Sequence, residues 1–354
     1  MTTERDIELL HCAARLAIRG HGGVEPNPMV GCVITNNEGR IVGSGYHRTC
    51  GEAHAEINAI QNAGAATQDG TAYISLEPCN HHGKTPPCTT ALVESGITRV
   101  VIGIEDPHPE AGGGATYLEQ SGLEVTIVND QVCHDLVAPF VHRLQTGLPW
   151  VICKWAQTID GCTEPSNDGS PWISSPSSLR LVHRERGRVD AIIVGAGTVA
   201  SDNPTLTVRG TTKRRTPLRV VIDPTLRSEP NSNIFNDDAP TLLAHAKGED
   251  ASTHTSTTLA LPRKGNSLEL APLLQHLASE YNAANVIIEG GATTFAHLFD
   301  QCLANELWVF TAPHSADHTP KINMNDLMKN LSLRLLDERM RENDTVSRYR
   351  ITHC

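Results

Sequence analysis

One histidine and two cysteines in the first part of the chain have the side chains and the spacing of a zinc site. His54 begins a His-Ala-Glu triplet, and Cys79 and Cys88 each follow a proline, with eight residues between the two cysteines. One imidazole and two thiolates suit Zn²⁺ and leave its fourth tetrahedral position for water. An open position of this kind is typical of a catalytic zinc site.

Glu56 lies two residues after the histidine, which gives the His-x-Glu and Pro-Cys pattern typical of zinc deaminases. Zinc lowers the pKa of a bound water to about 7, so that hydroxide can attack an amino-bearing ring carbon. A carboxylate that does not bind the metal can take the water proton and pass it to the ring nitrogen and to the departing ammonia. We therefore predict hydrolytic deamination with Glu56 as the catalytic residue.

Two other interpretations of these residues stay open at this point. Each residue taken alone is more often an ordinary packed or solvated side chain. A purely structural zinc is the intermediate case, and it needs a fourth ligand, for which His81, His82 or Cys50 is available. A deaminase that acts on nucleic acid is disfavoured, because the loop between Cys79 and Cys88 exceeds the two-residue spacing common in those enzymes.

Three motifs together resemble the bifunctional deaminase/reductases of riboflavin biosynthesis. They are Pro26-Asn27-Pro28, the Gly51–Glu56 segment, and the extended loop from Cys79 to Cys88. The likeness continues through the Lys154–Gly161 segment to Glu289-Gly290-Gly291, and so covers about nine-tenths of the chain. The resemblance implies two activities: zinc-dependent deamination of a phosphoribosylamino-pyrimidinone, then NADPH-dependent reduction of its ribosyl group to ribityl. A chain with only one working half is the alternative.

The resemblance also implies site residues, by matched position. In the deaminase half, the matched positions imply that the pocket is lined by Asn27, His47, His81, Lys84 and Asp106, of which Lys84 suits a phosphate. This family usually has Asn two residues after the matched Asp106, where this chain has His108. In the reductase half, the implied cofactor contacts are Ala156, Trp172, Thr198, Asp202 and the turn from Gly291 to His297. The implied substrate contacts there are Ser170, Arg186, Leu206, Arg209 and Glu289.

Two glycine turns in the second half could receive a cofactor phosphate. Gly195–Ala200 formally fits G-x-G-x-x-G/A, but Ser201–Pro204 is expected to interrupt the helix that a Rossmann unit needs there. The Val286–Gly291 segment is the better candidate, because a strand ends there in glycines at a helix start, where backbone N–H groups can bind an anion. Lys213-Arg214-Arg215 could favour a 2′-phosphate, although a basic surface loop is the commoner explanation.

The apolar patterns predict two α/β domains, 1–146 and 149–354, separated at Gln145–Pro149. By resemblance, the first is a cytidine-deaminase-like three-layer α/β domain and the second is a dihydrofolate-reductase-like α/β domain. Strands are expected at 29–35, 41–46, 71–76, 99–104, 125–128, 151–155, 191–194, 218–222, 285–289 and 306–311, and helices at 4–19, 53–63, 89–95, 176–186, 268–281 and 293–302. Residues 231–266 are expected to form a loop-rich insertion, and the residues after Pro313 are left unassigned.

The composition excludes several classes of protein. The 354 residues include 40 Asp and Glu against 29 Lys and Arg, and the net charge of −11 disfavours a nucleic-acid partner. No apolar run approaches the roughly 18 residues of a membrane span, and Met1–Asp6 lacks the features of a signal peptide. Ten cysteines show no disulfide framework. We expect a cytoplasmic enzyme with a small-molecule substrate and no membrane partner, and a homo-oligomer is compatible with the sequence.

Overall fold

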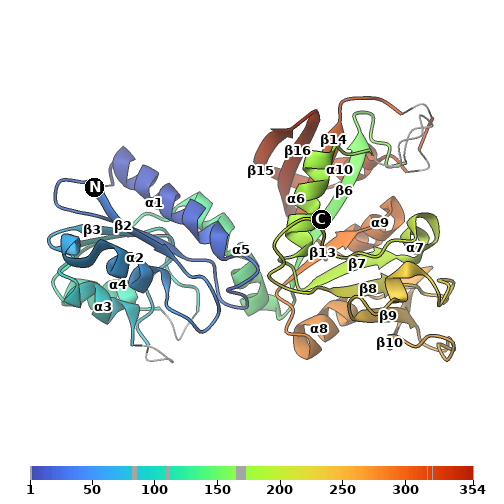
Figure 1. The fold of residues 1–354 in the computed structure, drawn as a ribbon, viewed down its shortest axis with the longest axis horizontal. Coiled ribbons are helices and arrows are strands. Elements are labelled where there is room, and N and C mark those ends of the chain that lie inside the picture. The colour runs from blue at the N-terminus through green and yellow to red at the C-terminus, as the bar shows by residue number, and fades with distance from the viewer. Residues whose placement is uncertain are drawn as a thin grey trace. The chain divides into compact units, whose positions relative to one another are not determined.

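The computed structural model describes residues 2–81, 86–108, 112–164, 173–316, 318–320 and 322–353. The chain divides into two units, Met1–Thr146 and Gly147–Cys354, each with its own sheet and core (Figure 1). In the described part of the chain, no helix combines the length and the apolar character that crossing a membrane requires.

The first unit is built on a five-stranded sheet in the order β2-β1-β3-β4-β5. Its strands are β1 (Gly31–Thr35), β2 (Ile41–Tyr46), β3 (Thr71–Ile74), β4 (Arg99–Ile102) and β5 (Glu124–Ile127). The expected strands at 29–35 and 41–46 form an antiparallel hairpin, β1 and β2, and Gly39 in their turn has a φ of 76°, which favours glycine. Strands β3, β4 and β5 run parallel, so that their carboxyl ends lie at one edge of the sheet.

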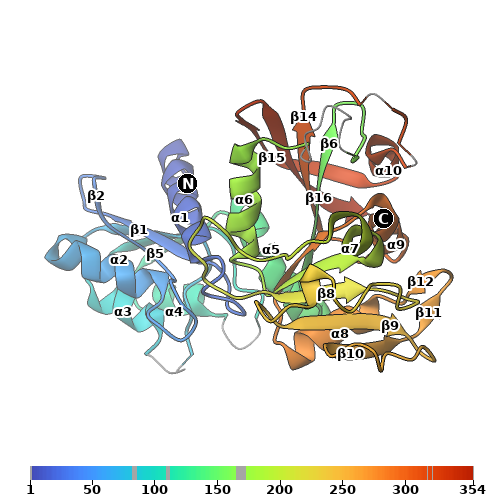
Figure 2. The same ribbon diagram turned by 45° about the vertical axis from the view of Figure 1, so that its right-hand side comes forward.

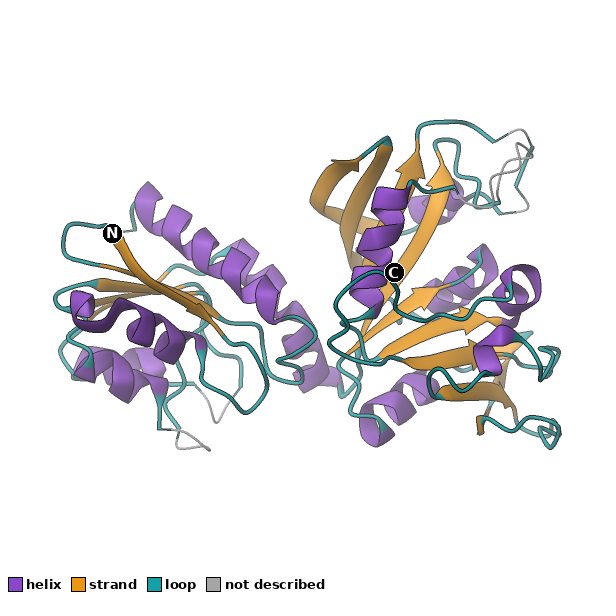
Figure 3. Cartoon of the chain, viewed as in Figure 1, coloured by secondary structure: helices purple, strands orange, loops and turns teal. Residues whose placement is uncertain are grey.

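Helices cover both faces of this sheet and complete the expected three layers (Figure 3). Leu10 and Ala14 of α1 share a core with Cys133 and Leu136 of α5, while Leu92 of α3 belongs to the core on the other face. The helices are α1 (Glu4–Ala17), α2 (Ala55–Ala63), α3 (Cys88–Glu94), α4 (Gly114–Gln120) and α5 (Gln131–Thr146), with short 3-10 turns η1 (Ile18–Gly20) and η2 (Gly64–Thr67). Neither α4 nor α5 was predicted from the sequence.

The second unit contains a nine-stranded sheet in the order β10-β9-β8-β7-β13-β6-β14-β16-β15 (Figure 2). Strands β10 to β14 in this order are parallel neighbours, and β16 and β15 are antiparallel additions at one edge. The strands are β6 (Trp150–Thr158), β7 (Ala191–Gly195), β8 (Leu218–Ile222), β9 (Thr241–Ala246), β10 (Thr257–Leu261), β13 (Asn285–Glu289), β14 (Glu306–Ala312), β15 (Ser332–Arg341) and β16 (Asp344–His353). A separate small ribbon pairs β11 (Arg263–Lys264) with β12 (Ser267–Leu268).

Alternation along β6 separates two faces of this sheet. Val151, Cys153 and Trp155 lie in the large core that also contains Leu273 of α8 and Phe295 of α9. Lys154 therefore points to the opposite face. The helices and turns are α6 (Pro176–Arg186), α7 (Ala196–Asp202), α8 (Ala271–Glu280), α9 (Ala292–Asp300), α10 (Met324–Lys329) and η3 (Asn233–Phe235).

Two expectations for the second unit are wrong, and the segment that was left unassigned contains regular secondary structure. The predicted insertion at 231–266 contains β9, whose six residues are all buried in the sheet, and β10 beside it. A strand that is buried on both faces has a short apolar run in place of the alternation of apolar and polar residues. In β9 this run is short and has polar residues around it, so it was not recognised as a strand. The unassigned residues after Pro313 include α10 and the β15–β16 hairpin. A seven-residue helix, α7, follows β7 directly and extends through Ser201 and Asp202, where a break was expected.

Candidate active sites

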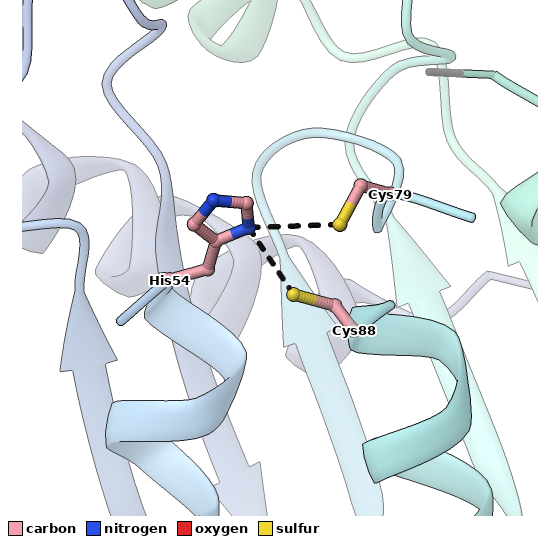
Figure 4. Close-up of side chains that lie close together, drawn as sticks. All are labelled: His54, Cys79 and Cys88. Atoms are coloured by element: carbon pink, nitrogen blue, oxygen red, sulfur yellow. Dashed lines mark hydrogen bonds between the residues drawn. The ribbon is translucent and has the colours of Figure 1, made fainter. Parts of the chain in front are cut away.

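The fold brings the three predicted zinc ligands together in the first unit (Figure 4). His54 is the N-cap of α2, Cys88 is the first residue of α3, and Cys79 lies in the segment after β3. The Nδ1 atom of His54 is 3.6 Å from Sγ of Cys79 and 3.3 Å from Sγ of Cys88. Cys79 lies in coil, whereas Cys88 begins a helix.

The donor atoms fit a zinc ion. Tetrahedral bonds of about 2.3 Å to sulfur and about 2.0 Å to nitrogen place these ligand atoms about 3.5 Å apart, and the observed separations match. Among the described residues, no further His, Cys, Asp or Glu joins this group, which excludes His81 and Cys50 as the fourth ligand in this arrangement. His82 lies outside the described residues. A three-ligand set supports the catalytic interpretation over the structural one.

Polar contacts hold the two cysteines next to each other. Thr89, which is fully buried, donates its backbone N–H to the Cys79 carbonyl at 3.4 Å and its hydroxyl to Oδ1 of Asn80 at 2.8 Å. These bonds tie the segment after β3 to the first turn of α3. The Asn58 amide donates to the carbonyls of Ala53 and Tyr46, both at 3.1 Å, and so fixes the turn that precedes His54.

Glu56 occupies the first turn of α2 and is 3% exposed. It is outside the group of ligand atoms, and its Oε2 atom is buried with no hydrogen-bond partner. Burial raises the pKa of this carboxyl to about 7, although the nearby His54 acts in the opposite direction. A carboxyl that exchanges its proton near neutral pH, with an oxygen available to a ligand, is suited to proton transfer.

The two thiols share a proton in the metal-free protein. A hydrogen bond from the Cys88 thiol lowers the pKa of Cys79, and the same bond raises the pKa of Cys88. Because zinc binds thiolates, metal binding at this site is expected to release that proton.

The residues implied for the pyrimidine pocket are only partly brought together. The Asn27 amide lies 3.4 Å from Nε2 of His47, whose Nδ1 contacts the Ala53 carbonyl at 3.2 Å. The His47 and His54 rings meet edge to face at 5.1 Å between centroids, so His47 and Asn27 adjoin the metal group. Burial lowers the pKa of His47. His81 is exposed, and Lys84 lies outside the described residues.

Glu77 is a positioning residue that was not predicted. It is 7% exposed, and its two carboxylate oxygens accept the backbone N–H groups of Asp106 at 2.9 Å and Ala115 at 2.8 Å. It therefore fixes the segment that carries Asp106 and the start of α4. The sequence did contain a signal, since Glu77 is an acid directly before Pro78-Cys79. Burial raises the pKa of Asp106, and the His108 backbone N–H donates to it at 2.8 Å.

A buried charge cluster lies between the carboxyl end of β13 and the middle of β6 in the second unit. The Arg186 guanidinium donates two hydrogen bonds to the Glu289 carboxylate, at 2.6 and 2.8 Å. Lys154 pairs with Glu289 in the strand register, and its Nζ is 4.0 Å from the carboxylate. Burial opposes ionisation of Glu289, but the charge and hydrogen bonds of Arg186 lower its pKa to about 2. Burial lowers the pKa of Lys154.

This cluster changes the expected roles of its members. Arg186 was expected to contact substrate, but its guanidinium group binds the Glu289 carboxylate. His183 of α6 lies near the same cluster. Burial lowers the pKa of His183, and the charges of Arg186, Glu289 and Arg209 also influence it. Neither Lys154 nor His183 was predicted as a site residue. A single lysine within the apolar run of β6 was the available signal for Lys154.

Two glycine turns meet at the same edge of the sheet. Gly195 ends β7 and Gly290 follows β13, and a Cβ at either position would contact the side chain of Thr294 in α9. Gly291 is the exposed N-cap of α9, and the space beside it is open. Because β7 and β13 are parallel, α7 and α9 both begin at the same edge of the sheet. The backbone N–H groups at the start of a helix can bind a phosphate.

The remaining residues implied for the reductase are distributed as follows. Thr198 and Asp202 lie on α7, where the Ser201 hydroxyl donates to Asp202 at 2.6 Å, and Ala156 lies in β6. Leu206 is buried with a φ of 49°, and the exposed Arg209 donates to the hydroxyls of Thr205 and Thr207. Ser170 and Trp172 lie outside the described residues. Arg215 forms an ion pair with Asp190, which favours a structural role for that basic residue.

Comparison with known proteins agrees with this division. Residues 3–104 match the cytidine and deoxycytidylate deaminase zinc-binding region, and residues 149–335 match the RibD C-terminal domain. The riboflavin biosynthesis protein RibD of Bacillus amyloliquefaciens is 39% identical over 311 residues, 86% of this chain and 83% of the relative. The Escherichia coli K12 protein of the same name is 36% identical over 316 residues, 85% of this chain and 86% of that protein.

Solved structures give the same result over nearly the whole chain. RibD of Acinetobacter baumannii, form 1, superposes with a TM-score of 0.78 at 30% identity and covers 99% of both chains. A diaminohydroxyphosphoribosylaminopyrimidine deaminase/5-amino-6-(5-phosphoribosylamino)uracil reductase of Thermotoga maritima gives 0.79 at 30% identity, with 98% of this chain and 99% of that chain covered.

The fold and the matched regions define a bifunctional enzyme, with a zinc-binding deaminase domain of the cytidine deaminase type followed by a reductase domain that uses NADPH. The chain belongs to the RibD family of riboflavin biosynthesis. The predicted α/β fold class, the two kinds of activity and the two cofactors are thereby confirmed.

Proposed function

We propose that the first unit converts 2,5-diamino-6-(5-phosphoribosylamino)pyrimidin-4-one and water into the corresponding uracil derivative and ammonia. The second unit then reduces the ribosyl group of that product with NADPH. The Thermotoga maritima relative, a diaminohydroxyphosphoribosylaminopyrimidine deaminase/5-amino-6-(5-phosphoribosylamino)uracil reductase, supports this substrate assignment. The observation that carries the proposal is the three-ligand group of His54, Cys79 and Cys88 beside a buried Glu56 oxygen that has no partner.

His54, Cys79 and Cys88 would hold the zinc ion in the deaminase unit. Zinc, when bound, activates water as a nucleophile. Glu56 takes one proton from the attacking water and delivers it to the ring nitrogen. It then takes the second proton from the same oxygen and delivers it to the amino group, which leaves as ammonia when its bond to the ring carbon breaks. Its buried position and its pKa of about 7 allow both directions of transfer near neutral pH. Asn27 and His47, which adjoin the metal group, are proposed to orient the pyrimidine, together with His81, Lys84 and Asp106.

In the reductase unit, NADPH supplies the hydride that adds to ribosyl C1′. The glycine turn at Gly291, with Ala156, Trp172, Thr198 and Asp202, is proposed to hold the cofactor. When the hydride adds to C1′, the atom bonded to C1′ receives an electron pair and must be protonated. Glu289 is ionised at neutral pH and so can only accept hydrogen bonds, which removes it as the donor. Lys154, buried beside it with a lowered pKa, is the proposed donor.

Substrate binding in this unit is assigned to Arg209, Leu206, Ser170 and the Arg186–Glu289 pair. Arg209 is exposed and suits the sugar phosphate, while Arg186 positions Glu289 through two hydrogen bonds. We further propose the domain limits 1–146 and 149–354 and a location in the cytoplasm. All nine cysteines among the described residues are free thiols, which fits a reducing compartment. We also propose that the chain forms a homo-oligomer, and the molar mass measured by light scattering tests this.

Turnover with the purified full chain tests the proposal. Given the diamino substrate and NADPH, the protein should release ammonia and then oxidise NADPH, and NADPH oxidation should require prior deamination. A chelator that removes zinc should stop ammonia release but leave reduction of the pre-deaminated substrate. Ammonia release that persists without metal would refute the deaminase assignment, and failure to oxidise NADPH with the deaminated compound would refute the reductase assignment.

A further inference from the structure

A second group of metal-binding side chains lies in the reductase unit, among residues that neither site above uses. The Cys162 Sγ atom, a Glu164 carboxylate oxygen and a His318 ring nitrogen all lie within 4.8 Å of one another. Nε2 of His318 is 3.4 Å from the Cys162 sulfur and 2.9 Å from Oε2 of Glu164. Cys162 is fully buried, whereas the side chains of Glu164 and His318 are 52% and 30% exposed.

We propose that Cys162, Glu164 and His318 bind a divalent ion of the zinc class. Sulfur and nitrogen ligands of a tetrahedral zinc lie about 3.5 Å apart, and nitrogen and oxygen ligands about 3.3 Å apart. The observed separations come close to these values and resemble the 3.3 and 3.6 Å of the first group. A mixed thiolate, imidazole and carboxylate set selects zinc or cobalt over magnesium or calcium. Among the described residues, no fourth His, Cys, Asp or Glu joins this group, and the Glu164 and His318 side chains are partly exposed to solvent.

The turn that carries Cys162 is rigid. The Thr158 backbone N–H donates to the Cys162 carbonyl at 2.9 Å, and the Cys162 N–H donates back to the Thr158 hydroxyl at 3.1 Å. Gly161 within this turn has a φ of 85°, and a Cβ there would collide with the side chain of Asn323. Glycine is therefore required at this position, and the turn holds the backbone of Cys162 through its N–H and carbonyl groups.

The segment that carries His318 is tied to the same turn. Both carboxylate oxygens of Asp160 accept the Ala316 backbone N–H, at 3.1 and 3.2 Å. The Ile159 N–H donates to the His314 carbonyl at 3.1 Å, and the Asn323 amide donates to the Asp160 carbonyl at 2.7 Å. These bonds join segments that are more than 150 residues apart in the chain without any metal. The ligand positions are therefore set by the fold, which lowers the conformational cost of binding an ion.

Metal content of the full chain tests the proposal. The protein is stripped with a chelator, reconstituted with Zn²⁺, freed of excess metal and measured by mass spectrometry of the element. The unmodified chain should hold about two ions, and His318→Ala and Cys162→Ser about one each. Cys302→Ser is the matched control, because Cys302 is an exposed free thiol outside both groups, and it should hold about two. One ion in the unmodified chain, or an unchanged content in His318→Ala, overturns the proposal.

Cobalt provides a second measurement that does not depend on those variants folding. In a Cys79→Ser/Cys88→Ser chain, which keeps no thiolate in the first group, Co²⁺ should still give a thiolate-to-cobalt absorption band, which comes from Cys162. Glu164→Gln changes an exposed side chain, so that the fold is retained, and it should weaken this binding at least about tenfold in a titration. An absent band in the Cys79→Ser/Cys88→Ser chain, or an unchanged affinity in Glu164→Gln, means that Cys162, Glu164 and His318 form only a hydrogen-bonded group.

Discussion

Arg186 of α6 and Glu289 at the end of β13 form a two-bond ion pair across 103 positions of the chain, with both guanidinium bonds directed at one carboxylate. Their side chains are 15% and 11% exposed. Lys154 lies next to Glu289 in the strand register, so one carboxylate compensates two nearby cations. The pair thereby sets both the position of Glu289 and the charge around Lys154.

Removing only Arg186 from the Arg186–Glu289 pair should destabilise the second unit more than removing the charges of both residues. Arg186→Ala should lower the free energy of unfolding of the second unit by about 3–5 kcal/mol, because a buried carboxylate loses its main partner. The Arg186→Ala/Glu289→Gln double variant should recover part of that loss. Urea unfolding followed by tryptophan fluorescence measures this in the second unit, because all four tryptophans, at 150, 155, 172 and 308, belong to it. Strictly additive effects would show that the two residues are not coupled.

Lys154→Met should abolish NADPH oxidation and leave ammonia release intact. In the unmodified enzyme, the reduction rate should fall as pH rises through the pKa of Lys154, which burial places below the ordinary lysine value of about 10.4. Lys154→Arg retains the charge but arginine does not deprotonate, so this variant should not restore NADPH oxidation. A pH–rate profile with the deaminated substrate makes the comparison. Normal turnover by Lys154→Met would remove the residue from the chemistry.

Glu77→Gln should slow deamination while zinc stays bound. Each Glu77 oxygen accepts a backbone N–H, and an amide NH₂ in place of one oxygen leaves a buried donor unsatisfied, at about 1–3 kcal/mol. The segment around Asp106 should then be less well fixed beside the metal group. Ammonia release and zinc content measure the effect, and reductase turnover of the same sample serves as the control. Unchanged ammonia release would show that this segment does not contribute to the site.

Asp6→Asn should destabilise the first unit at neutral pH and much less in acid. Two hydrogen bonds from Arg99, at 2.8 and 3.1 Å, hold the pKa of the buried Asp6 well below its usual range. Its contribution is therefore complete above the unfolded-state pKa of about 3.9 and declines as pH falls below that value. We expect a difference of about 3 kcal/mol at pH 7 that shrinks below about pH 4. Hydrogen exchange of first-unit peptides in urea measures it, and a difference independent of pH contradicts the assignment.

The chemistry of the first site could be predicted from the sequence because it depends on residue types at short spacings. His54, Glu56, Cys79 and Cys88 lie within 35 positions, and each follows or begins a local element whose signals were visible. Glu77 was overlooked because its partners, Asp106 and Ala115, are brought to it only by the pairing of parallel strands. No local pattern encodes that pairing.

The second site was harder to predict for the same physical reason. The register that places Lys154 beside Glu289, and the packing of α6 that places Arg186 opposite both, join three distant segments. Strand β9 was mistaken for a loop because burial on both faces removes the alternation that identifies a strand. The β15–β16 hairpin was left unassigned because β15 is a half-exposed edge strand rich in charged residues.

Ammonia release by Glu56→Gln is the most direct test of the central claim, that a buried carboxyl outside the metal ligands transfers the protons of deamination. The variant should bind zinc at the first site as the unmodified chain does, keep its reductase activity, and release ammonia at least about 100-fold more slowly. Ammonia release at the unmodified rate, with zinc in place, would contradict the account.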